Sequence, residues 1–596
     1  MTKATPTALY EAGLHHAREG RLLDAKSCCE QALSQDPGHA AALHLMGLLS
    51  VQGGQFGQAV EWISNAIRLD PRPDYLTSLA LALRHLGRYD EALAIADKAV
   101  QLKPDEAGLW MHLGEALLDA RRQAEALLSF QHALKLRPDH VDAAYRSGAL
   151  LLESRKYQEA LDLFSLCNRL RPDHVPTLQA LALASRGLNR LDEALAYNLR
   201  AHELDPRHAP TLSNIGDIVA HSPGREEEAI PWFDKALELE PNLIPALNNK
   251  AHLLYKLQRF DDFIATTRRV TAIDPDDVVA ATALGQFDLL TGNFETGWIG
   301  YEARLRNPTS AYPKLAQPMW LGDASLEGKT ILVGTDEGLG DTIQFVRYVP
   351  MLAARGARVI LVVQDPLHRL MSNLSGVSQC LSTSQTITLS QIDLHCPMCS
   401  LPRAFSTRLE TIPANIPYLP SPTDDCLRVW EDRLGPHVLP RIGLVWSGNP
   451  KHVNDHNRSA PLRTLVRMLD GIEATFVSLQ KDPRPDDKAT LQELAGRIID
   501  PTAHLTDFSE TAALIKCLDL VITVDTSVAH LAGALGCPTW ILLPFTPDWR
   551  WMLGREDSPW YPAVRLFRQD RGRDWTPVVQ RVRGELETAL PRFRKH

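Results

Sequence analysis

The chain contains 596 residues, a length that predicts about three or four domains rather than one core. Hydrophobic residues make up 44% of it and charged residues 23%, which is typical of a globular protein. The net charge of −9 argues against a general binder of nucleic acid or of anionic membranes. The sequence also contains no run of 18 apolar residues, so it predicts no membrane span.

Nine cysteines are scattered along the chain, and the N-terminal segment lacks the apolar core of a signal peptide. Both features favour a reduced, cytoplasmic protein over a disulfide-bonded one. Cys396 and Cys399 form a CxxC motif, a pattern that also occurs in metal and redox sites. Because no second CxxC accompanies it, we interpret both cysteines as structural and expect no metal site.

Prolines recur through the first half of the chain at intervals of 33 to 35 residues. They are Pro37, Pro71, Pro104, Pro138, Pro172, Pro206, Pro241 and Pro275. Small residues keep the same phase: Gly114, Ala126 and Ala133 precede Pro138 by 24, 12 and five residues, and Gly47 precedes Pro71 by 24. Small side chains let two antiparallel helices cross closely, and a proline ends the second helix of each pair. The period therefore predicts a stack of helix pairs.

This pattern resembles the tetratricopeptide repeat, with about eight repeats and a degenerate ninth that caps the stack, over residues 1–310. Terminal repeats often deviate because they cap the array or dock onto the next domain. We accordingly expect Trp298 and Tyr301, in the ninth unit, to lie at an interface. One position on the first helix of each pair, about 26 residues before the proline, could line a peptide-binding groove. Asn214 and Asn249 at this position fit an asparagine ladder, while the residues at the same position of the other repeats do not. Both a protein-binding groove and a simple scaffold remain open.

The second half has a different sequence pattern, in which short apolar runs alternate with segments of helical periodicity. The runs predicted as buried strands are 329–333, 358–363, 441–446, 475–479, 520–524 and 539–543. A glycine turn at 336–341 and an apolar helical pattern to Pro350 separate the first two, which makes a βαβ unit. Two such blocks, divided by the proline-rich stretch 413–440, predict two Rossmann-like domains around a ligand cleft.

Short motifs follow in order through this half. They are Gly340–Asp341, Trp446–Pro450, Asp455–Ser459, Ser478–Lys481, Asp525–Gly533, Trp549–Trp551 and Trp560–Pro562. Together they resemble the glycosyltransferase domain related to bacterial heptosyltransferases (glycosyltransferase family 9-like), in bacterial proteins that place it after tetratricopeptide repeats. The resemblance implies a GT-B fold with an acceptor-side Rossmann-like half at 311–435 and a donor-side half at 436–596. It implies a nucleotide-sugar cosubstrate and no further cofactor.

The donor site is predicted where a strand meets a helix near residue 525. The free N–H groups and dipole at a helix N-terminus favour an anion such as a sugar-nucleotide diphosphate. Thr526 and Ser527 add hydroxyl donors, and the resemblance implies that Asp525, Thr526 and His530 contact the donor. Ser527 stands where the family has glycine, which leaves the close backbone approach open. The alternative is that Thr526 only caps the helix and that His530 is a core histidine.

Three further residues of the donor half are predicted to bind the donor. Arg458 and Lys481 follow strand ends, where their charges can neutralise the leaving diphosphate in an enzyme that uses no metal. Asn449 belongs to the Trp446–Pro450 motif, and the resemblance assigns it to the same site. Ordinary surface cations are the alternative for Arg458 and Lys481.

Asp341 is the predicted catalytic residue, because the family uses the matching aspartate as general base toward the acceptor. A positioned base contributes about 10²–10⁴-fold to the rate. The alternative is an aspartate that only stabilises the start of its helix. Glu337, on the same glycine turn, ranks below Asp341 as a second acidic group.

We therefore expect a metal-independent glycosyltransferase that moves a hexosyl or heptosyl group from a nucleotide-diphosphate donor to a protein recruited by the repeats. Transfer to lipopolysaccharide or another glycan is the nearest alternative, and a repeat scaffold with an inactive transferase half is the other. An open cleft between Asp341 and Thr526 would favour the enzyme, and side chains filling that cleft would favour the scaffold.

Overall fold

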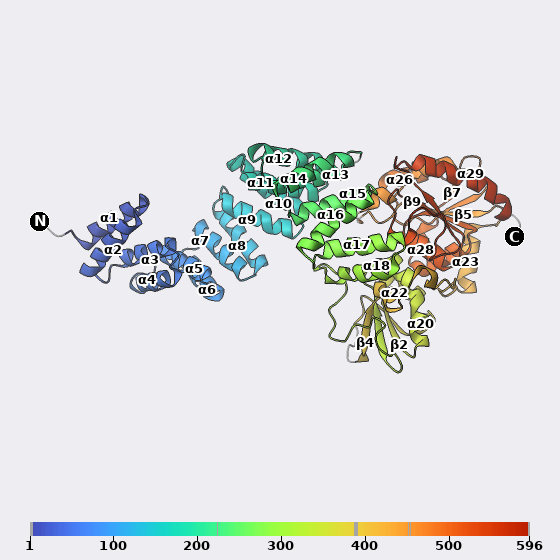
Figure 1. The fold of residues 1–596 in the computed structure, drawn as a ribbon, viewed down its shortest axis with the longest axis horizontal. Coiled ribbons are helices and arrows are strands. Elements are labelled where there is room, and N and C mark those ends of the chain that lie inside the picture. The colour runs from blue at the N-terminus through green and yellow to red at the C-terminus, as the bar shows by residue number, and fades with distance from the viewer. Residues whose placement is uncertain (1–3, 223, 387–390, 451, 453, 594–596) are drawn as a thin grey trace. The chain divides into compact units, whose positions relative to one another are not determined.

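A computed structural model describes residues 4–222, 224–386, 391–450, 452 and 454–593 (Figure 1). The chain divides into two compact units, Met1–Asn249 and Lys250–His596. The last repeats therefore belong to the same unit as the two parallel sheets. Within the described residues, no helix combines the length and the apolar character that crossing a membrane requires.

The first unit consists of antiparallel helix pairs joined by short turns. Its helices are α1 (Pro6–Arg18), α2 (Leu22–Gln35), α3 (Ala40–Gln52), α4 (Phe56–Leu69), α5 (Pro73–His85), α6 (Tyr89–Leu102), α7 (Ala107–Asp119), α8 (Gln123–Leu136), α9 (Val141–Glu153), α10 (Tyr157–Leu170), α11 (Val175–Gly187), α12 (Leu191–Leu204), α13 (Ala209–Ala220), α14 (Ile230–Leu239) and α15 (Ile244–Lys256), which crosses the boundary between the units. The predicted stack of helix pairs is confirmed, and each second helix ends two residues before a periodic proline.

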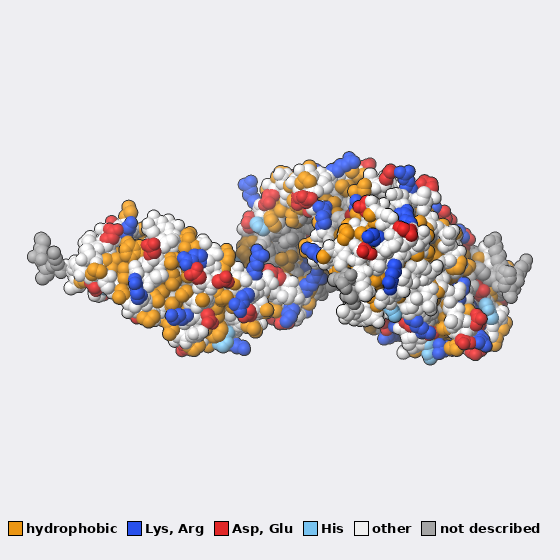
Figure 2. All heavy atoms as spheres, turned by 90° about the horizontal axis from the view of Figure 1, so that it is seen from below, with side chains coloured by type: hydrophobic (Ala, Val, Ile, Leu, Met, Phe, Trp, Pro, Cys, Tyr) orange, Lys and Arg blue, Asp and Glu red, His pale blue; other side chains and the backbone are white. Residues whose placement is uncertain are grey.

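Small residues on each first helix make room for a residue on the second. A Cβ on Gly114 would lie 2.4 Å from the Phe130 ring, and one on Gly148 would lie 2.8 Å from the Phe164 ring. Not every side chain of the stack is covered: Leu69, at the end of α4, is 54% exposed. Figure 2 shows many such apolar side chains at the surface of the N-terminal repeats.

The second unit joins the last repeats to two parallel sheets. Its helices are α16 (Phe260–Ile273), α17 (Val278–Thr291), α18 (Phe294–Tyr301), α19 (Leu339–Phe345), α20 (Val349–Ala354), α21 (Asp365–Met371), α22 (Leu401–Ala404), α23 (Asp424–Leu434), α24 (Asp455–Arg458), α25 (Leu462–Leu465), α26 (Pro485–Glu493), α27 (Phe508–Lys516), α28 (Ser527–Ala534) and α29 (Trp575–Phe593). Helices and parallel strands alternate along the chain, as in other α/β folds (Figure 1). This arrangement confirms the predicted fold class, an all-α repeat array followed by a GT-B-like α/β region.

The strands form one sheet of four and one of six. They are β1 (Thr330–Gly334), β2 (Arg358–Val363), β3 (Val377–Ser382), β4 (Leu394–Pro397), β5 (Arg441–Val445), β6 (Thr475–Ser478), β7 (Ile498–Ile499), β8 (Leu520–Val524), β9 (Thr539–Leu543) and β10 (Val564–Arg568). The order is β3-β2-β1-β4 in the first sheet and β10-β9-β8-β5-β6-β7 in the second, with every pair parallel. All six predicted strands are confirmed, and the four that the prediction missed are the edges of the sheets.

A continuous apolar core joins the ninth repeat unit to both sheets. Trp298 lies edge-to-face against Trp549 and Trp560, with ring centroids 5.3 and 6.4 Å apart. Its indole N–H donates to the carbonyl of Thr407 at 2.9 Å. Tyr301 also contacts the Trp549 ring. The predicted interface role of Trp298 and Tyr301 is confirmed.

Candidate functional site

Two strand-to-helix turns, one from each sheet, meet at the candidate site. The turn after β1 leads into α19, and the turn after β8 leads into α28. A Cβ on Gly340 would lie 2.8 Å from Cδ2 of His530, so only glycine lets α19 approach α28 this closely. The fold thus brings Asp341 and the predicted donor segment Asp525–His530 together, and side chains occupy the space between them.

Arg550 occupies the centre of this junction and was given no role by the sequence. Its Nε donates to Oε1 of Gln344 at 2.7 Å, its Nη1 to Oδ1 of Asp548 at 2.8 Å, and its Nη2 to Oδ1 of Asp341. The guanidinium also lies over the Trp549 ring, 4.2 Å from its centroid. Arg550 thus binds α19 to the loop that follows β9. The tryptophan-rich motif around it was the one signal in the sequence.

Asp341 has both carboxylate oxygens engaged. Oδ1 accepts from Arg550, and Oδ2 accepts from the backbone N–H of Gly338 at 2.8 Å. The second bond links the third residue of α19 to its N-cap, which stabilises the helix start. Burial raises the pKa of Asp341, and the charge of Arg550 opposes that rise.

Two more carboxylates belong to the same charge cluster. Burial and the neighbouring Asp548 raise the pKa of Asp525. Burial acts in the same direction on Asp548, but the Arg550 charge and its hydrogen bonds outweigh it and lower the pKa of Asp548. Such crowding of buried charges is frequent at functional sites.

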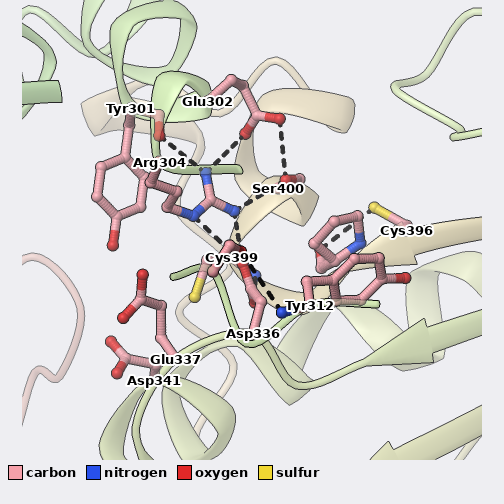
Figure 3. A network of polar contacts seen from close by, with 12 residues as sticks. Tyr301, Glu302, Arg304, Tyr312, Asp336, Glu337, Asp341, Cys396, Cys399 and Ser400 are labelled. Atoms are coloured by element: carbon pink, nitrogen blue, oxygen red, sulfur yellow. Dashed lines mark hydrogen bonds and ion pairs between the residues drawn. The ribbon is translucent and has the colours of Figure 1, made fainter. Parts of the chain in front are cut away.

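Glu337 lies beside Asp341 on the turn between β1 and α19 and is exposed. In Figure 3 its carboxyl group points toward that of Asp341, with the Tyr301 hydroxyl on the other side. Although the residue is exposed, the surrounding protein atoms partly desolvate its carboxyl group, and this desolvation, with the nearby charges of Asp341 and Asp336, raises the pKa of Glu337 to about 7. The site therefore holds two adjacent acids, Glu337 and Asp341. The sequence analysis ranked Asp341 first as the catalytic base.

The turn that carries Glu337 is anchored by a buried network (Figure 3). Asp336 accepts from Arg304 at 2.7 and 3.2 Å and from the backbone N–H of Cys399 at 3.0 Å. Arg304 also donates to Glu302 at 3.0 Å and to Ser400 at 2.9 Å. Because Glu302 and Arg304 follow α18 directly, the end of the repeat array fixes this turn.

His530 is buried and lies within the junction. Its Nδ1 is 2.9 Å from the Tyr561 hydroxyl, and its ring stacks on Trp551 with centroids 5.3 Å apart. Burial and the charge of Arg550 lower the pKa of His530 to about 3, so the ring is neutral near pH 7. The structure places His530 against α19 and leaves its predicted contact with a donor as a prediction.

The start of α28 is the part of the predicted donor site that stays partly open. Asp525, Thr526 and Ser527 are all half-buried. Thr526 is the N-cap residue without a side-chain capping bond, and its hydroxyl lies 3.3 Å from that of Thr523. Arg458 donates to the carbonyl of Asp525 at 3.2 Å. Arg458 therefore lies next to the start of α28, and the donor role of these residues stays a prediction.

Lys481 and Asn449 are exposed and lie on the loops that follow β6 and β5. The buried position after β6 belongs to Gln480, whose side-chain oxygen accepts from the backbone N–H groups of Trp446 and Ser447 at 3.1 and 2.9 Å. The donor role of Lys481 and Asn449 stays a prediction.

Cys396 and Cys399 are buried and free, and burial raises the pKa of both thiols. This fits the structural interpretation of the CxxC motif. Among the described residues, no group of three or more histidine, cysteine or acidic side chains is arranged to hold a metal ion.

Comparisons with known proteins find tetratricopeptide repeats in the first half of the chain and a glycosyltransferase segment in the second. Residues 10–72, 44–107, 111–174 and 211–243 match tetratricopeptide repeat families, and residues 471–570 match glycosyltransferase family 9 (heptosyltransferase). Protein FlbA of Caulobacter vibrioides is 26% identical over 64% of this chain and 65% of its own length. Human tetratricopeptide repeat protein 7B is 30% identical over 16% of this chain and 12% of its own.

The chain therefore spans just under two thirds of FlbA and a small part of the human protein. Among solved structures, Pseudomonas aeruginosa pilF matches with 24% identity, covering 34% of this chain and 92% of that one at a TM-score of 0.32. The repeats and the family 9 segment together bear out the resemblance predicted from the sequence.

Proposed function

We propose, for a chain that combines tetratricopeptide repeats with a glycosyltransferase family 9 domain, that it transfers a sugar from a nucleotide-diphosphate donor to a protein acceptor. The observation that carries this proposal is the junction of α19 and α28, where a helix N-terminus meets a cluster of acids and arginines inside the predicted GT-B region. The donor is a cytoplasmic metabolite, so the proposal places the reaction in the cytoplasm.

In this proposal the start of α28 binds the diphosphate. The N–H groups at the start of the helix and the hydroxyls of Thr526 and Ser527 point to an anion. Arg458, which donates to the Asp525 carbonyl, and Lys481 supply positive charge as the diphosphate leaves. That charge would do the work of a metal ion, so the proposed transfer is metal-independent.

The acid pair at the start of α19 supplies the base. Transfer requires a group that removes the acceptor proton while the acceptor oxygen attacks the anomeric carbon. Asp341 is the third residue of α19, whose start meets α28 at Gly340, and Glu337 lies on the turn just before that helix. Asp341 is the general base that the resemblance implies, and Glu337 is the second candidate for that role.

The acceptor is proposed to bind the repeats. A cavity of about 340 Å³ opens in the first unit, lined by Leu152, Tyr157, Leu183, Arg186 and His221 among others. Apolar walls suit a peptide segment that carries an apolar side chain, while Arg186 at this cavity is already paired with Asp217. This supports a protein acceptor over a glycan.

The proposal is tested by titrating the full chain with UDP-glucose, UDP-N-acetylglucosamine, GDP-mannose and ADP-glucose in a calorimeter. We expect one nucleotide class to bind and Arg458→Ala to weaken that binding tenfold or more. Arg463→Ala is the matched control, because this arginine of the same half is 70% exposed and contacts Glu493 and Thr490 rather than the start of α28. Absence of binding to every donor would contradict the proposal.

A scaffold with an inactive transferase half is the second candidate. The ion pair between Arg550 and Asp341 favours it, as does the close approach of His530 to Gly340, because both fill the space predicted to be a cleft. This candidate predicts that the repeats still capture a protein partner while the panel of donors leaves the calorimetric signal unchanged.

A further inference from the structure

We propose that Glu337, rather than Asp341, removes the proton from the acceptor hydroxyl, and that Asp341 is a positioning residue that holds Arg550. This assignment rests on the transferase function proposed above and names the residue that performs its proton transfer. It reverses the ranking of the two acids that the sequence suggested.

Both carboxylate oxygens of Asp341 already accept hydrogen bonds within the protein. Its Oδ1 accepts from Arg550 and its Oδ2 accepts from the N–H of Gly338. Its side chain is only 22% exposed. A base must accept a proton from an incoming hydroxyl, and doing so at Asp341 would break the ion pair that holds α19 to the loop after β9.

Glu337 has the opposite properties. Among the described residues no hydrogen bond or ion pair reaches its carboxylate, and the residue is exposed. Its backbone is nevertheless fixed, because its carbonyl accepts from the side-chain amide of Gln364 at 2.9 Å. The adjoining Asp336 is held by Arg304. Glu337 therefore presents an unoccupied carboxylate from a rigid turn.

The ninth repeat unit contributes to the surroundings of this carboxylate. Tyr301, the last residue of α18, lies between the Arg304 guanidinium, 4.5 Å from its ring centroid, and the Trp549 ring. Its hydroxyl points toward Glu337 in Figure 3. Burial raises the pKa of Tyr301, so the hydroxyl stays protonated and can donate a hydrogen bond to an acceptor oxygen. The repeat array thus supplies a polar group to the proposed site.

The Glu337 carboxylate takes the proton of the acceptor O–H, and the oxygen forms a bond to the anomeric carbon of the sugar. The bond from that carbon to the diphosphate breaks, and the nucleoside diphosphate leaves with the electron pair. Glu337 then returns the proton to water. A pKa near 7 suits this task, because a base is most effective close to the working pH.

The decisive experiment measures hydrolysis of the donor that binds, with water as acceptor, for the wild type, Glu337→Gln and Asp341→Asn. We expect Glu337→Gln to keep donor affinity and to lose about 10²–10⁴-fold in kcat. The wild-type rate should rise with pH through about 7, and this rise should be absent in Glu337→Gln. Glu337→Asp should recover part of the rate. Asp341→Asn should lower the thermal stability, which Glu337→Gln should not do.

A second measurement uses stability alone. An acid whose folded pKa is raised stabilises the fold below its unfolded pKa, and this contribution is lost as the pH rises through the folded pKa. The Tm of Glu337→Gln relative to the wild type should therefore be higher at pH 8.5 than at pH 5. An equal difference at both pH values would show that the carboxylate is not crowded and would overturn the proposal.

The outcomes separate the two proposals. If the wild type turns over donor and Glu337→Gln is as fast, the assignment of the base is wrong while the transferase function stands. If no donor binds, the transferase function itself is contradicted, and the assignment falls with it.

Discussion

Arg550 connects three acceptors that belong to different parts of the second unit. Asp341 and Gln344 lie on α19, and Asp548 lies in the loop after β9. The Arg550 side chain is 8% exposed, so its charge depends on these partners for solvation. An arginine that satisfies all three at once fixes the geometry of the acid cluster.

Replacing Arg550 should therefore destabilise the second unit strongly. Arg550→Met leaves the half-buried carboxylates of Asp341 and Asp548 without their partner, which costs about 1–3 kcal/mol in the free energy of unfolding. Urea unfolding measures this loss. Arg497→Met is the control, since Arg497 and Asp470 form an exposed pair worth about 0–1 kcal/mol. Equal losses in both variants would contradict a buried network at Arg550.

Gly340 is the residue that permits the contact between the two helix starts. A methyl group there would lie 2.8 Å from His530, so Gly340→Ala should cost about 1–3 kcal/mol through overpacking. Gly584→Ala is the matched control, because a Cβ on this glycine of α29 meets nothing within 4 Å. It should leave stability unchanged or raise it by up to about 1 kcal/mol. Thermal unfolding of the two variants decides this prediction.

The helix pairs of the repeats follow a size rule between two fixed positions. Where the residue 24 before the proline is glycine, the residue eight before it is large in most repeats, as with Gly47 and Ile63 or Gly114 and Phe130. Where the first is alanine, the second is smaller, as with Ala80 and Ala96. The large side chain on the second helix thus fills the space that the glycine on the first helix leaves free.

This rule predicts compensation within a repeat. Gly114→Ala should destabilise the first unit by about 1–3 kcal/mol, because the new methyl group overlaps the Phe130 ring. Adding Phe130→Leu should recover part of that loss. Gly108→Ala, also on α7 but with nothing within 4 Å of its Cβ, should not destabilise. Denaturant unfolding of the three variants tests the rule, and strictly additive losses in the double variant would refute it.

The strands that could be predicted from the sequence are those that are buried on both faces of a sheet. The inner strands β1, β2, β5, β6, β8 and β9 are covered on both faces and are recognisable as apolar runs. The missed strands β3, β4, β7 and β10 are edges, where one side of the ladder is free and polar residues or a proline are tolerated. Their hydrophobic patterns are correspondingly weak.

The candidate site divides in the same way. Asp341 and the Asp525–His530 segment were found because each follows a strand with its own local pattern. Arg550 and the exposed state of Glu337 were missed, because they depend on which residues a distant loop brings to α19. Such contacts between segments far apart in sequence leave no periodic signal in the chain.

At the scale of the whole molecule, stability should depend on pH in two opposite ways. Each unit contains a histidine whose pKa is lowered by burial: that of the half-buried His44 in α3 to about 4, and that of the buried His530 in α28 to about 3. The second unit also contains acids whose pKa is raised by burial, with Glu337 at about 7. The histidines favour the folded state at higher pH, and the acids favour it at lower pH.

The loss of stability at acidic pH can be assigned to the two units separately, because each contains one of these histidines. A histidine with a lowered folded pKa stabilises the fold above its unfolded pKa of about 6.5, and the contribution is lost as the pH falls toward the folded pKa. We therefore expect the contribution of the two histidines to the free energy of unfolding to fall between pH 6.5 and 4. The fall should be less steep in His44→Gln for the first unit and in His530→Gln for the second.

Urea unfolding followed by circular dichroism at pH 7.5, 6.5, 5.5 and 4.5 measures these slopes. His15→Gln is the control for the substitution itself, because the His15 side chain is 68% exposed. Replacing His44 also removes its 2.9 Å contact with the Ser78 hydroxyl, which lowers stability at every pH without changing the slope. An unchanged slope in His44→Gln would mean that this ring is not buried in its neutral form.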